Sequence, residues 1–271
     1  MLQKRIAQVS SWLTFLPENL IANSEGCAEL AARVHGSVIT NGTITGRMSH
    51  RDPNMAQIPS LASPYGKECR SCWTVADKFK LVGIDASGLE LRMLAHYLND
   101  EEFTDDIING DIHTANQKRA GLKSRNQAKT FIYAFLYGAG DAKIGSVIGG
   151  NKAEGKRVKQ SFLANFGTLK TFRNRITREA EQNGFIKGLD GRKIFIRSAH
   201  AALNSLLQGA GAIVMKRALV IFDELIKENN LLANCVANVH DEWQVEVLEE
   251  EAEQLGQLGV DAIRAAGVYY K

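Results

Sequence analysis

The stretch ANCVANVHDEWQVEV, residues 233–247, places two runs of apolar β-forming residues on either side of the tripeptide HDE. Such runs around a short polar segment predict a strand–turn–strand hairpin with His240, Asp241 and Glu242 at its tip. A carboxylate at the tip of a rigid hairpin is well placed to hold a metal ion against a substrate. A solvated turn acid is the more common explanation for such a tripeptide alone.

A second carboxylate ends an apolar run. Residues 80–84, KLVGI, predict a short buried strand, and Asp85 follows them before a Ser-Gly turn into a helix. An acid at that position is either a helix cap or a metal ligand. Because Ser87 is available as the cap, we expect Asp85 to be a ligand. Two aspartates on adjacent strands can bridge two Mg²⁺ ions about 3.5–4 Å apart.

A basic helix is predicted at residues 124–140, SRNQAKTFIYAFLYGAG. Arg125, Lys129, Tyr133 and Tyr137 recur every four residues, so they share one face of a helix. Two cations at one end of the face suit a triphosphate, and an aromatic ring beyond them can stack on a base. An ordinary amphipathic helix with solvent-directed cations is the alternative.

The remaining pattern predicts an α+β fold with a mainly antiparallel sheet, because strand signals lie at both ends of the chain and a helical block lies between them. Two more hairpins are expected, at residues 36–45 around Asn41-Gly42 and at residues 185–196 around Asp190-Gly191. Helices are expected at residues 1–32, 88–98, 201–229 and 249–266, with three or four more between 111 and 183, while residues 46–64 are expected to be irregular.

Charge is distributed unevenly along the chain. Residues 111–220 carry 20 Lys and Arg against 6 Asp and Glu, whereas residues 221–271 carry 3 against 11 and residues 1–110 carry 10 against 13. A basic middle beside acidic flanks favours an extended polyanion as partner, and solvated helix surface is the alternative.

Size and composition are those of an ordinary globular protein, with 271 residues, 45% of them apolar and 23% charged. We expect no membrane partner, because no run of 18 apolar residues occurs and the first 20 residues lack signal-peptide features. The single C-x-x-C, Cys69 and Cys72, has no second pair at zinc spacing, so reduced thiols are favoured. These features predict a cytoplasmic location, in the host cell if the chain is viral.

Three segments resemble the catalytic motifs of the family A DNA polymerases. VGIDASGLELRMLAHY, residues 82–97, is similar to motif A, and RNQAKTFIYAFLYG, residues 125–138, is similar to motif B. Residues 239–242 resemble motif C. Residues 45–60, 110–117 and 188–211 also resemble the family, in the family's order. The resemblance covers nearly the whole chain and is greatest to the replicative polymerases of short-tailed bacteriophages.

The resemblance implies an antiparallel-sheet palm with an inserted helical fingers subdomain, and no thumb or exonuclease domain. The implied subdomains are a remnant of the thumb base at residues 1–34, palm at 35–110, fingers at 111–187 and palm again at 188–271. The chain is then expected to be a fragment, or one half of a split polymerase whose separate partner chain supplies thumb and exonuclease.

The implied activity is DNA synthesis for phage replication, extending primer–template DNA with deoxynucleoside triphosphates by two-metal transfer with Mg²⁺ or its substitute Mn²⁺. The implied metal ligands are Asp85, Asp241 and the Ala86 carbonyl, with Glu242 and Lys129 also catalytic. The implied nucleotide contacts are His113, Arg125, Lys129, Tyr133, Tyr137 and Glu90, the last beside Tyr133 where it blocks a 2′-hydroxyl. The implied DNA contacts are Arg47, Gln57, Asn204, Gln208 and His240.

Several alternatives stay open at this point. Asn204 and Gln208 are four residues apart on one helix face and suit polar packing as well as DNA, and His113 suits a cap. A single-subunit RNA polymerase shares the paired aspartates and a Lys/Tyr helix, although Glu90 argues against it. A non-catalytic DNA-binding remnant has no need for two metal ligands.

Overall fold

The computed structural model describes residues 34–270, which form two compact units. The first unit comprises the described residues up to Ala86 together with Met215–Tyr269. The second comprises Ser87–Val214 with Tyr270. The helix predicted at residues 1–32 and the thumb remnant at 1–34 lie almost wholly outside the described residues. The units divide the chain at other positions than the predicted subdomains, whose assignment stays a prediction.

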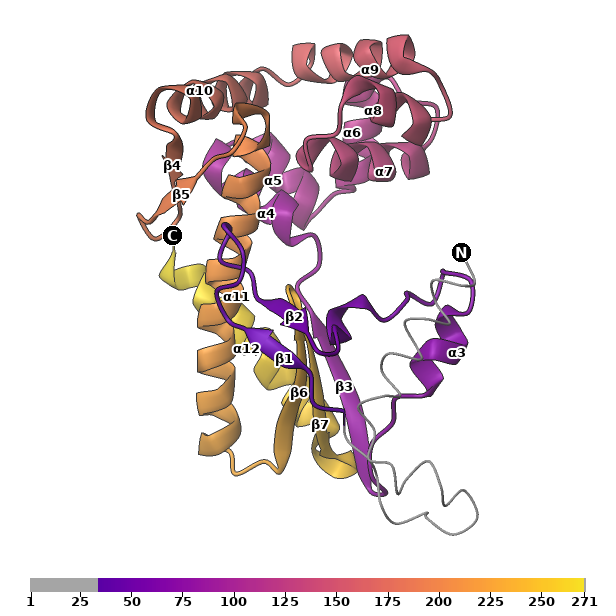
Figure 1. Cartoon of the computed structure of the whole chain (residues 1–271), viewed down its shortest axis with the longest axis vertical. Coiled ribbons are helices and arrows are strands. Elements are labelled where there is room, and N and C mark those ends of the chain that lie inside the picture. The colour runs from indigo at the N-terminus through magenta and orange to yellow at the C-terminus, as the bar shows by residue number, and fades with distance from the viewer. Residues whose placement is uncertain (1–33, 271) are drawn as a thin grey trace. The chain divides into compact units, whose positions relative to one another are not determined.

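The first unit is built on a three-stranded antiparallel sheet (Figure 1). Its strands are β3 (Phe79–Asp85), β6 (Ala233–Val239) and β7 (Glu242–Leu248), in the order β3-β7-β6. β6 and β7 form the hairpin predicted at residues 233–247, with a bulge between Cys235 and Ala237. The antiparallel sheet and the strand ending at Asp85 are therefore confirmed.

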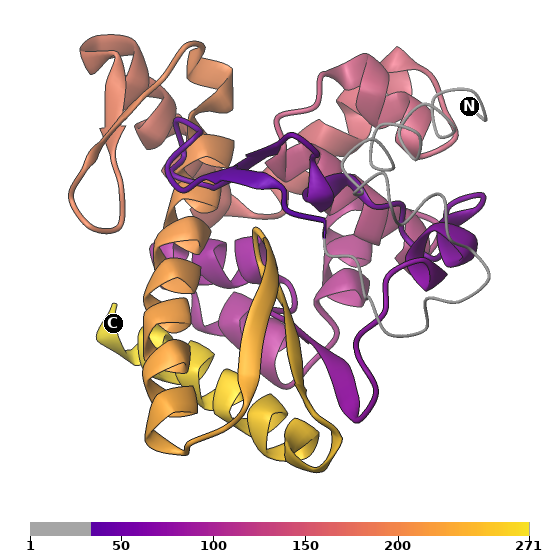
Figure 2. The ribbon, with the colours of Figure 1, turned by 60° about the horizontal axis from the view of Figure 1, so that its bottom comes forward.

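One face of this sheet is covered by helices (Figure 2). Ile84 of β3 is opposite Trp243 of β7, so both side chains point to the same face. Trp243 is fully buried and stacks on Phe222 of α11 (Ala202–Glu228), with 5.1 Å between ring centroids. Ile84 packs against Gly259 of α12 (Ala252–Tyr269). The residues that alternate with Ile84 and Trp243 therefore belong to the opposite face.

The rest of the first unit corrects one predicted hairpin. β1 (Ser37–Ile39) pairs with β2 (Ser49–Arg51) and not with residues 42–45, so the connection is longer than an Asn-Gly turn. Residues 46–64, expected to be irregular, contain β2 and the short helix η1 (Met55–Gln57), and α3 (Gly66–Ser71) follows. The Lys216 ammonium group donates to the Thr40 carbonyl at 2.6 Å, and the Gly46 N–H donates to the Thr43 carbonyl at 3.0 Å within this connection.

The second unit is mainly helical. Between residues 111 and 183 it contains five helices, where three or four were predicted. Its helices, apart from the first part of α11, are α4 (Leu89–Leu98), α5 (Glu101–Ile108), α6 (Ile112–Ala120), α7 (Arg125–Leu136), α8 (Asp141–Val147), α9 (Lys152–Ala164) and α10 (Gly167–Asn183). Phe131, Phe162 and Phe166 lie within a continuous apolar core that joins α6, α7, α9 and α10. α5 was not predicted.

The predicted second hairpin is confirmed as β4 (Phe185–Lys187) and β5 (Lys193–Phe195). Gly191 has a φ of 79°, a conformation that glycine adopts without a steric penalty. The long helix predicted at residues 201–229 is α11. The described segment Ala199–Glu228 is long and apolar enough to span a membrane, but 67% of its apolar window is buried in the protein, as in a core helix.

Candidate active site

A group of three carboxylates, the carboxylate site, lies in the first unit where β3 meets the β6–β7 turn. Asp85 is the direct partner of Glu242 in the strand register, so their side chains lie on the same face of the sheet. Asp241 is in the turn, and its carbonyl accepts a 2.9 Å hydrogen bond from the Ala86 backbone N–H. These backbone contacts bring together the acids of residues 85, 241 and 242.

The electrostatics of Asp85 confirm this proximity. Partial desolvation raises the pKa of the Asp85 carboxyl above its ordinary value, and the negative charges of Asp241 and Glu242 raise it further. The Glu242 carboxylate also accepts a hydrogen bond from the Gln244 amide, its neighbour on the same face. The like charges beside Asp85 disfavour its ionised state and favour a bound cation.

The carboxylate site is not a complete metal site by itself. Among residues 34–270, no group of three or more His, Cys, Asp or Glu side chains is arranged to hold a metal ion. Mg²⁺ is commonly held by only one or two carboxylates, together with water and substrate phosphates. The two aspartates supply such carboxylates. The predicted Ala86 ligand is its carbonyl, while its N–H is used by Asp241.

The helix after β3 corrects one step of the sequence argument. Gly88 occupies the N-cap position of α4 in a left-handed conformation, without a side-chain capping bond. Ser87 therefore does not cap, and its carbonyl instead accepts a 2.9 Å hydrogen bond from Arg92 Nε. Asp85 is the last residue of β3, and Gly88 is the N-cap of α4, so Asp85 has no capping role. The predicted reason, that Ser87 provides the cap, was wrong.

His240 occupies the first position of the hairpin turn. Its φ of 62° is typical of the two-residue turns that connect hairpin strands. Its ring lies edge-on to that of His50 on β2, with 6.3 Å between centroids. Burial lowers the pKa of His50, against a hydrogen bond with the Asn238 backbone that raises it. His240 is therefore packed against β2 beside the carboxylate site.

The second unit carries the predicted basic helix as α7. Ser124 caps it by accepting from the Gln127 N–H at 3.2 Å. Its buried face is formed by apolar residues three and four apart, which are Ala128, Phe131, Ile132, Phe135 and Leu136. Arg125 and Lys129 are exposed on the other side. The helix and the exposure of its two cations agree with the spacing argument, whereas Tyr133 is half-buried and Tyr137 is the C-cap.

His113 of α6 joins this stripe. Its ring centroid lies 6.2 Å from that of Tyr133. Burial lowers the pKa of His113, and the nearby positive charges of Arg125 and Lys129 lower it further, against Asp111, which raises it. Four of the predicted nucleotide contacts are therefore brought together within one unit. We call them the cationic face: His113, Arg125, Lys129 and Tyr133.

Glu90 and Tyr137 form a direct pair in the second unit. The Tyr137 hydroxyl donates to the Glu90 carboxylate at 3.1 Å. Glu90 is only 6% exposed, so this bond holds a buried charge in place. The prediction that Glu90 packs beside Tyr133 stays a prediction.

The predicted DNA contacts lie in both units. In the second unit, the Gln208 amide donates to the Asn204 side chain at 3.0 Å along one face of α11, as the four-residue spacing implied. In the first unit, Arg47 lies in the connection between β1 and β2, and Gln57 ends η1. No contact with DNA is described, so these assignments stay predictions.

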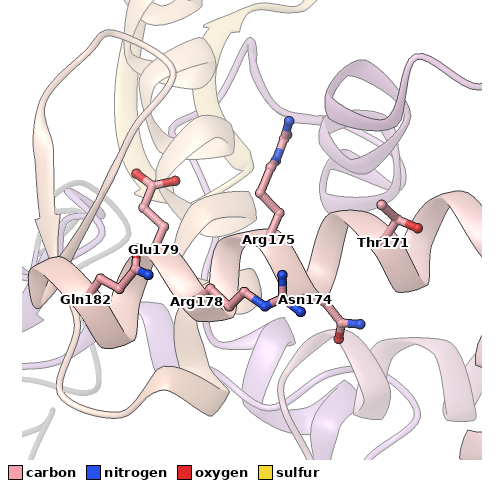
Figure 3. Close-up of a pocket in the computed structure, with 6 residues that line it drawn as sticks. All are labelled: Thr171, Asn174, Arg175, Arg178, Glu179 and Gln182. Atoms are coloured by element: carbon pink, nitrogen blue, oxygen red, sulfur yellow. The ribbon is translucent and has the colours of Figure 1, made fainter.

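Several polar side chains of α10, which lies in the basic middle of the chain, are exposed (Figure 3). They line a surface hollow of about 430 Å³ and are Thr171, Asn174, Arg175, Arg178, Glu179 and Gln182. None of the predicted site residues lines this hollow.

Three polar residues near these groups were not predicted from sequence: Asp111, His50 and Gln244. Asp111 bonds Arg125, His50 contacts the His240 ring, and Gln244 bonds Glu242. Only Asp111 carried a local signal, since an Asp before a helical pattern predicts an N-cap. Gln244 lies two residues from Glu242 on β7, and the contact of His50 with His240 joins two separate sheets.

The α+β fold, the acidic hairpin and the cationic helix are the features expected of a nucleic-acid polymerase domain. Residues 12–269 match the family model described as DNA polymerase family A, so the chain belongs to this family.

The relatives include phage and bacterial proteins. The chain is 39% identical over 306 residues to the DNA-directed DNA polymerase of Enterobacteria phage T3 and 41% identical over 290 residues to that of Escherichia phage T7. These alignments cover 100% and 94% of this chain but only 42% and 40% of the relatives. The chain therefore spans about two fifths of their length.

The fold is also that of a solved structure. The Pol domain of Pol1 from M. smegmatis, in complex with DNA primer-template and dNTP, matches with a TM-score of 0.82 at 23% identity. The match covers 96% of this chain and 47% of that one. It supports the polymerase-domain fold.

Proposed function

We propose that this chain extends a primer on a DNA template by transferring deoxynucleotides from their triphosphates. The observation that carries the proposal is the strand register that sets Asp85 opposite Glu242 and beside Asp241. Family membership and phage relatives named as DNA-directed DNA polymerases support it. The activity of the longer relatives comes to this chain only as this proposal.

In the proposed mechanism, Asp85, Asp241 and the Ala86 carbonyl hold the metal, and Glu242 supports them. Two Mg²⁺ ions, when bound, supply the charge that activates the primer 3′-oxygen and stabilises the departing pyrophosphate. Burial raises the pKa of Asp85 and the neighbouring negative charges of Asp241 and Glu242 raise it further, and this crowding of carboxylates suits divalent cations. Mn²⁺ is expected to substitute, since it accepts the same oxygen ligands.

The cationic face binds the triphosphate. Arg125 and Lys129 are exposed cations one helical turn apart, and the His113 ring is near both their charges and the Tyr133 ring. Lys129 neutralises or protonates the leaving side, since catalysis of this kind consists mainly of positioning and charge stabilisation. Tyr133 stacks at the new base pair.

Glu90 selects the sugar, because its buried carboxylate blocks a ribose 2′-hydroxyl. Its bond to Tyr137 fixes the position of the carboxylate and supports this role. Arg47, Gln57, Asn204, Gln208 and His240 are proposed to contact primer–template DNA, several of them in the minor groove. Acceptors in that groove occupy similar places in every correct pair, so contacts there test pair shape without reading sequence.

Primer extension with Mg²⁺ tests the proposal. Asp241→Ala abolishes extension and leaves primer–template binding largely intact, because the variant removes a metal ligand and no DNA contact. Asp261→Ala, which removes an exposed carboxylate of α12, is the matched control and retains wild-type extension. Extension by Asp241→Ala at the wild-type rate would contradict the metal assignment.

The same assay separates the alternatives. Preference for ribonucleotides would favour an RNA polymerase, and DNA binding without extension would favour a non-catalytic remnant. Adding a candidate chain that carries a thumb and an exonuclease tests the predicted split polymerase. If that prediction holds, the mixture binds DNA more tightly than this chain alone.

A further inference from the structure

Asp111 is held at the start of α6 by three hydrogen bonds. Its Oδ1 accepts from the His113 backbone N–H at 3.1 Å, which makes Asp111 the N-cap of the helix. Its Oδ2 accepts from the Thr114 hydroxyl at 2.8 Å and from Arg125 Nε at 2.6 Å. One carboxylate therefore joins the first turn of α6 to the first residue of α7.

The contact uses only one of the three guanidinium nitrogens of Arg125. The Arg125 side chain is 51% exposed, and Nη1 and Nη2 have no hydrogen-bond partner among the described residues. A guanidinium is planar, so a bond at Nε fixes the direction of the other two nitrogens. This arrangement leaves a two-pronged donor for an anion.

We propose that Asp111 is a positioning residue that orients Arg125 for the triphosphate of the incoming nucleotide. The inference rests on the proposed function, since it concerns the same nucleotide. Asp111 touches neither substrate nor metal in this role and acts through Arg125.

A capping role alone does not account for the carboxylate. Asn caps helices about as well as Asp. A negative charge beside cations that bind a triphosphate weakens their attraction for it. The charge-assisted bond to Arg125 is what an aspartate supplies and an asparagine does not. That bond also holds the pKa of the Asp111 carboxyl well below its usual range.

The test is Asp111→Asn in the full chain, measured by primer extension. The KM for the deoxynucleotide rises about tenfold while kcat stays near the wild-type value, because a charge-assisted bond that orients a ground-state contact is lost. Equilibrium binding of the nucleotide to protein with a dideoxy-terminated primer weakens by the same factor. A KM that is unchanged or lowered overturns the proposal, and lowering is the result if Asp111 only repels the triphosphate.

A double-mutant cycle separates positioning from a general structural effect. Lysine has no Nε–H in a planar fork, so Asp111→Asn leaves the KM unchanged in an Arg125→Lys background. An equal rise in both backgrounds overturns the proposal.

Asp100→Asn is the matched control, since Asp100 caps α5 without contacting Arg125, and its KM stays at the wild-type value. Asp111→Ser retains a cap and gives the same KM rise if Asp111→Asn does not fold. A wild-type chain that neither extends primers nor binds nucleotide contradicts the proposed function instead, so the two failures are distinguishable.

Discussion

The carboxylate site and the cationic face are built by different means. The carboxylate site joins residues about 160 positions apart through the pairing of β3 with β7, and it collects like charges. The cationic face lies on neighbouring helices, and its Arg125 is already paired with Asp111. The first group stores repulsion that a cation relieves, whereas the second keeps a net positive charge of which Asp111 offsets one part. The two groups therefore respond differently to metal, to mutation and to pH.

The largest expected difference concerns Asp85→Asn. Primer extension falls about a thousandfold or more, because metal-ion stabilisation of the transition state is worth several kcal/mol. The variant also needs a higher Mg²⁺ concentration for half-maximal rate. An unchanged Mg²⁺ dependence would contradict the assignment of Asp85 as a ligand.

Lys129→Ala tests the cationic face in the same assay. The value of kcat falls about a hundredfold, the usual order for removal of one donor that stabilises developing charge. Its Mg²⁺ dependence stays that of the wild type, in contrast to Asp85→Asn. Lys118→Ala, which removes an exposed cation of α6, retains the wild-type kcat and serves as control.

Glu90→Ala tests sugar selection. Incorporation of ribonucleotides relative to deoxynucleotides rises about tenfold or more. Removal of a steric barrier changes the free energy of discrimination by about 1–3 kcal/mol, which corresponds to at least about that factor. Tyr137→Phe removes only the hydrogen bond to Glu90 and gives a smaller rise. Unchanged discrimination in Glu90→Ala would remove the steric role.

The smallest effect is a dependence of stability on metal and pH. Because the folded-state pKa of Asp85 is raised, its contribution to stability is complete below the unfolded pKa and is lost as pH rises through the folded value. At neutral pH the carboxylate site is therefore destabilising without a cation. Mg²⁺ raises the melting temperature by a few degrees, which corresponds to about 1 kcal/mol in the free energy of unfolding. The same rise in Asp85→Asn would contradict this origin.

The sequence predicted those parts of the molecule that depend on local patterns. Helical spacing located Arg125, Lys129 and Tyr133 on one face, and the apolar runs around HDE located the β6–β7 hairpin. The strand end at Asp85 and the hairpin tip at Asp241 predicted a shared two-metal site, and the family resemblance made that pairing specific.

Two of the errors and omissions come from long-range contacts, and one comes from a local backbone conformation. The Asn41-Gly42 turn signal was overridden by pairing of β1 with β2 and by the bond from Lys216 to the Thr40 carbonyl. Ser87 was predicted as the N-cap of α4, but Gly88 occupies that position in a left-handed backbone conformation. The partnership of Asp111 with Arg125 depends on how α6 packs against α7, which no local pattern encodes.

Gly259 of α12 gives the carboxylate site a dependence on a residue that faces away from it. An added Cβ would lie 2.6 Å from Ile84 Cδ1, directly behind the residue that precedes Asp85. Any side chain there must displace the Ile84 side chain or the helix, and Ile84 is bonded directly to Asp85. Directed evolution that samples only residues in contact with DNA or nucleotide would therefore miss a position from which metal affinity can be tuned.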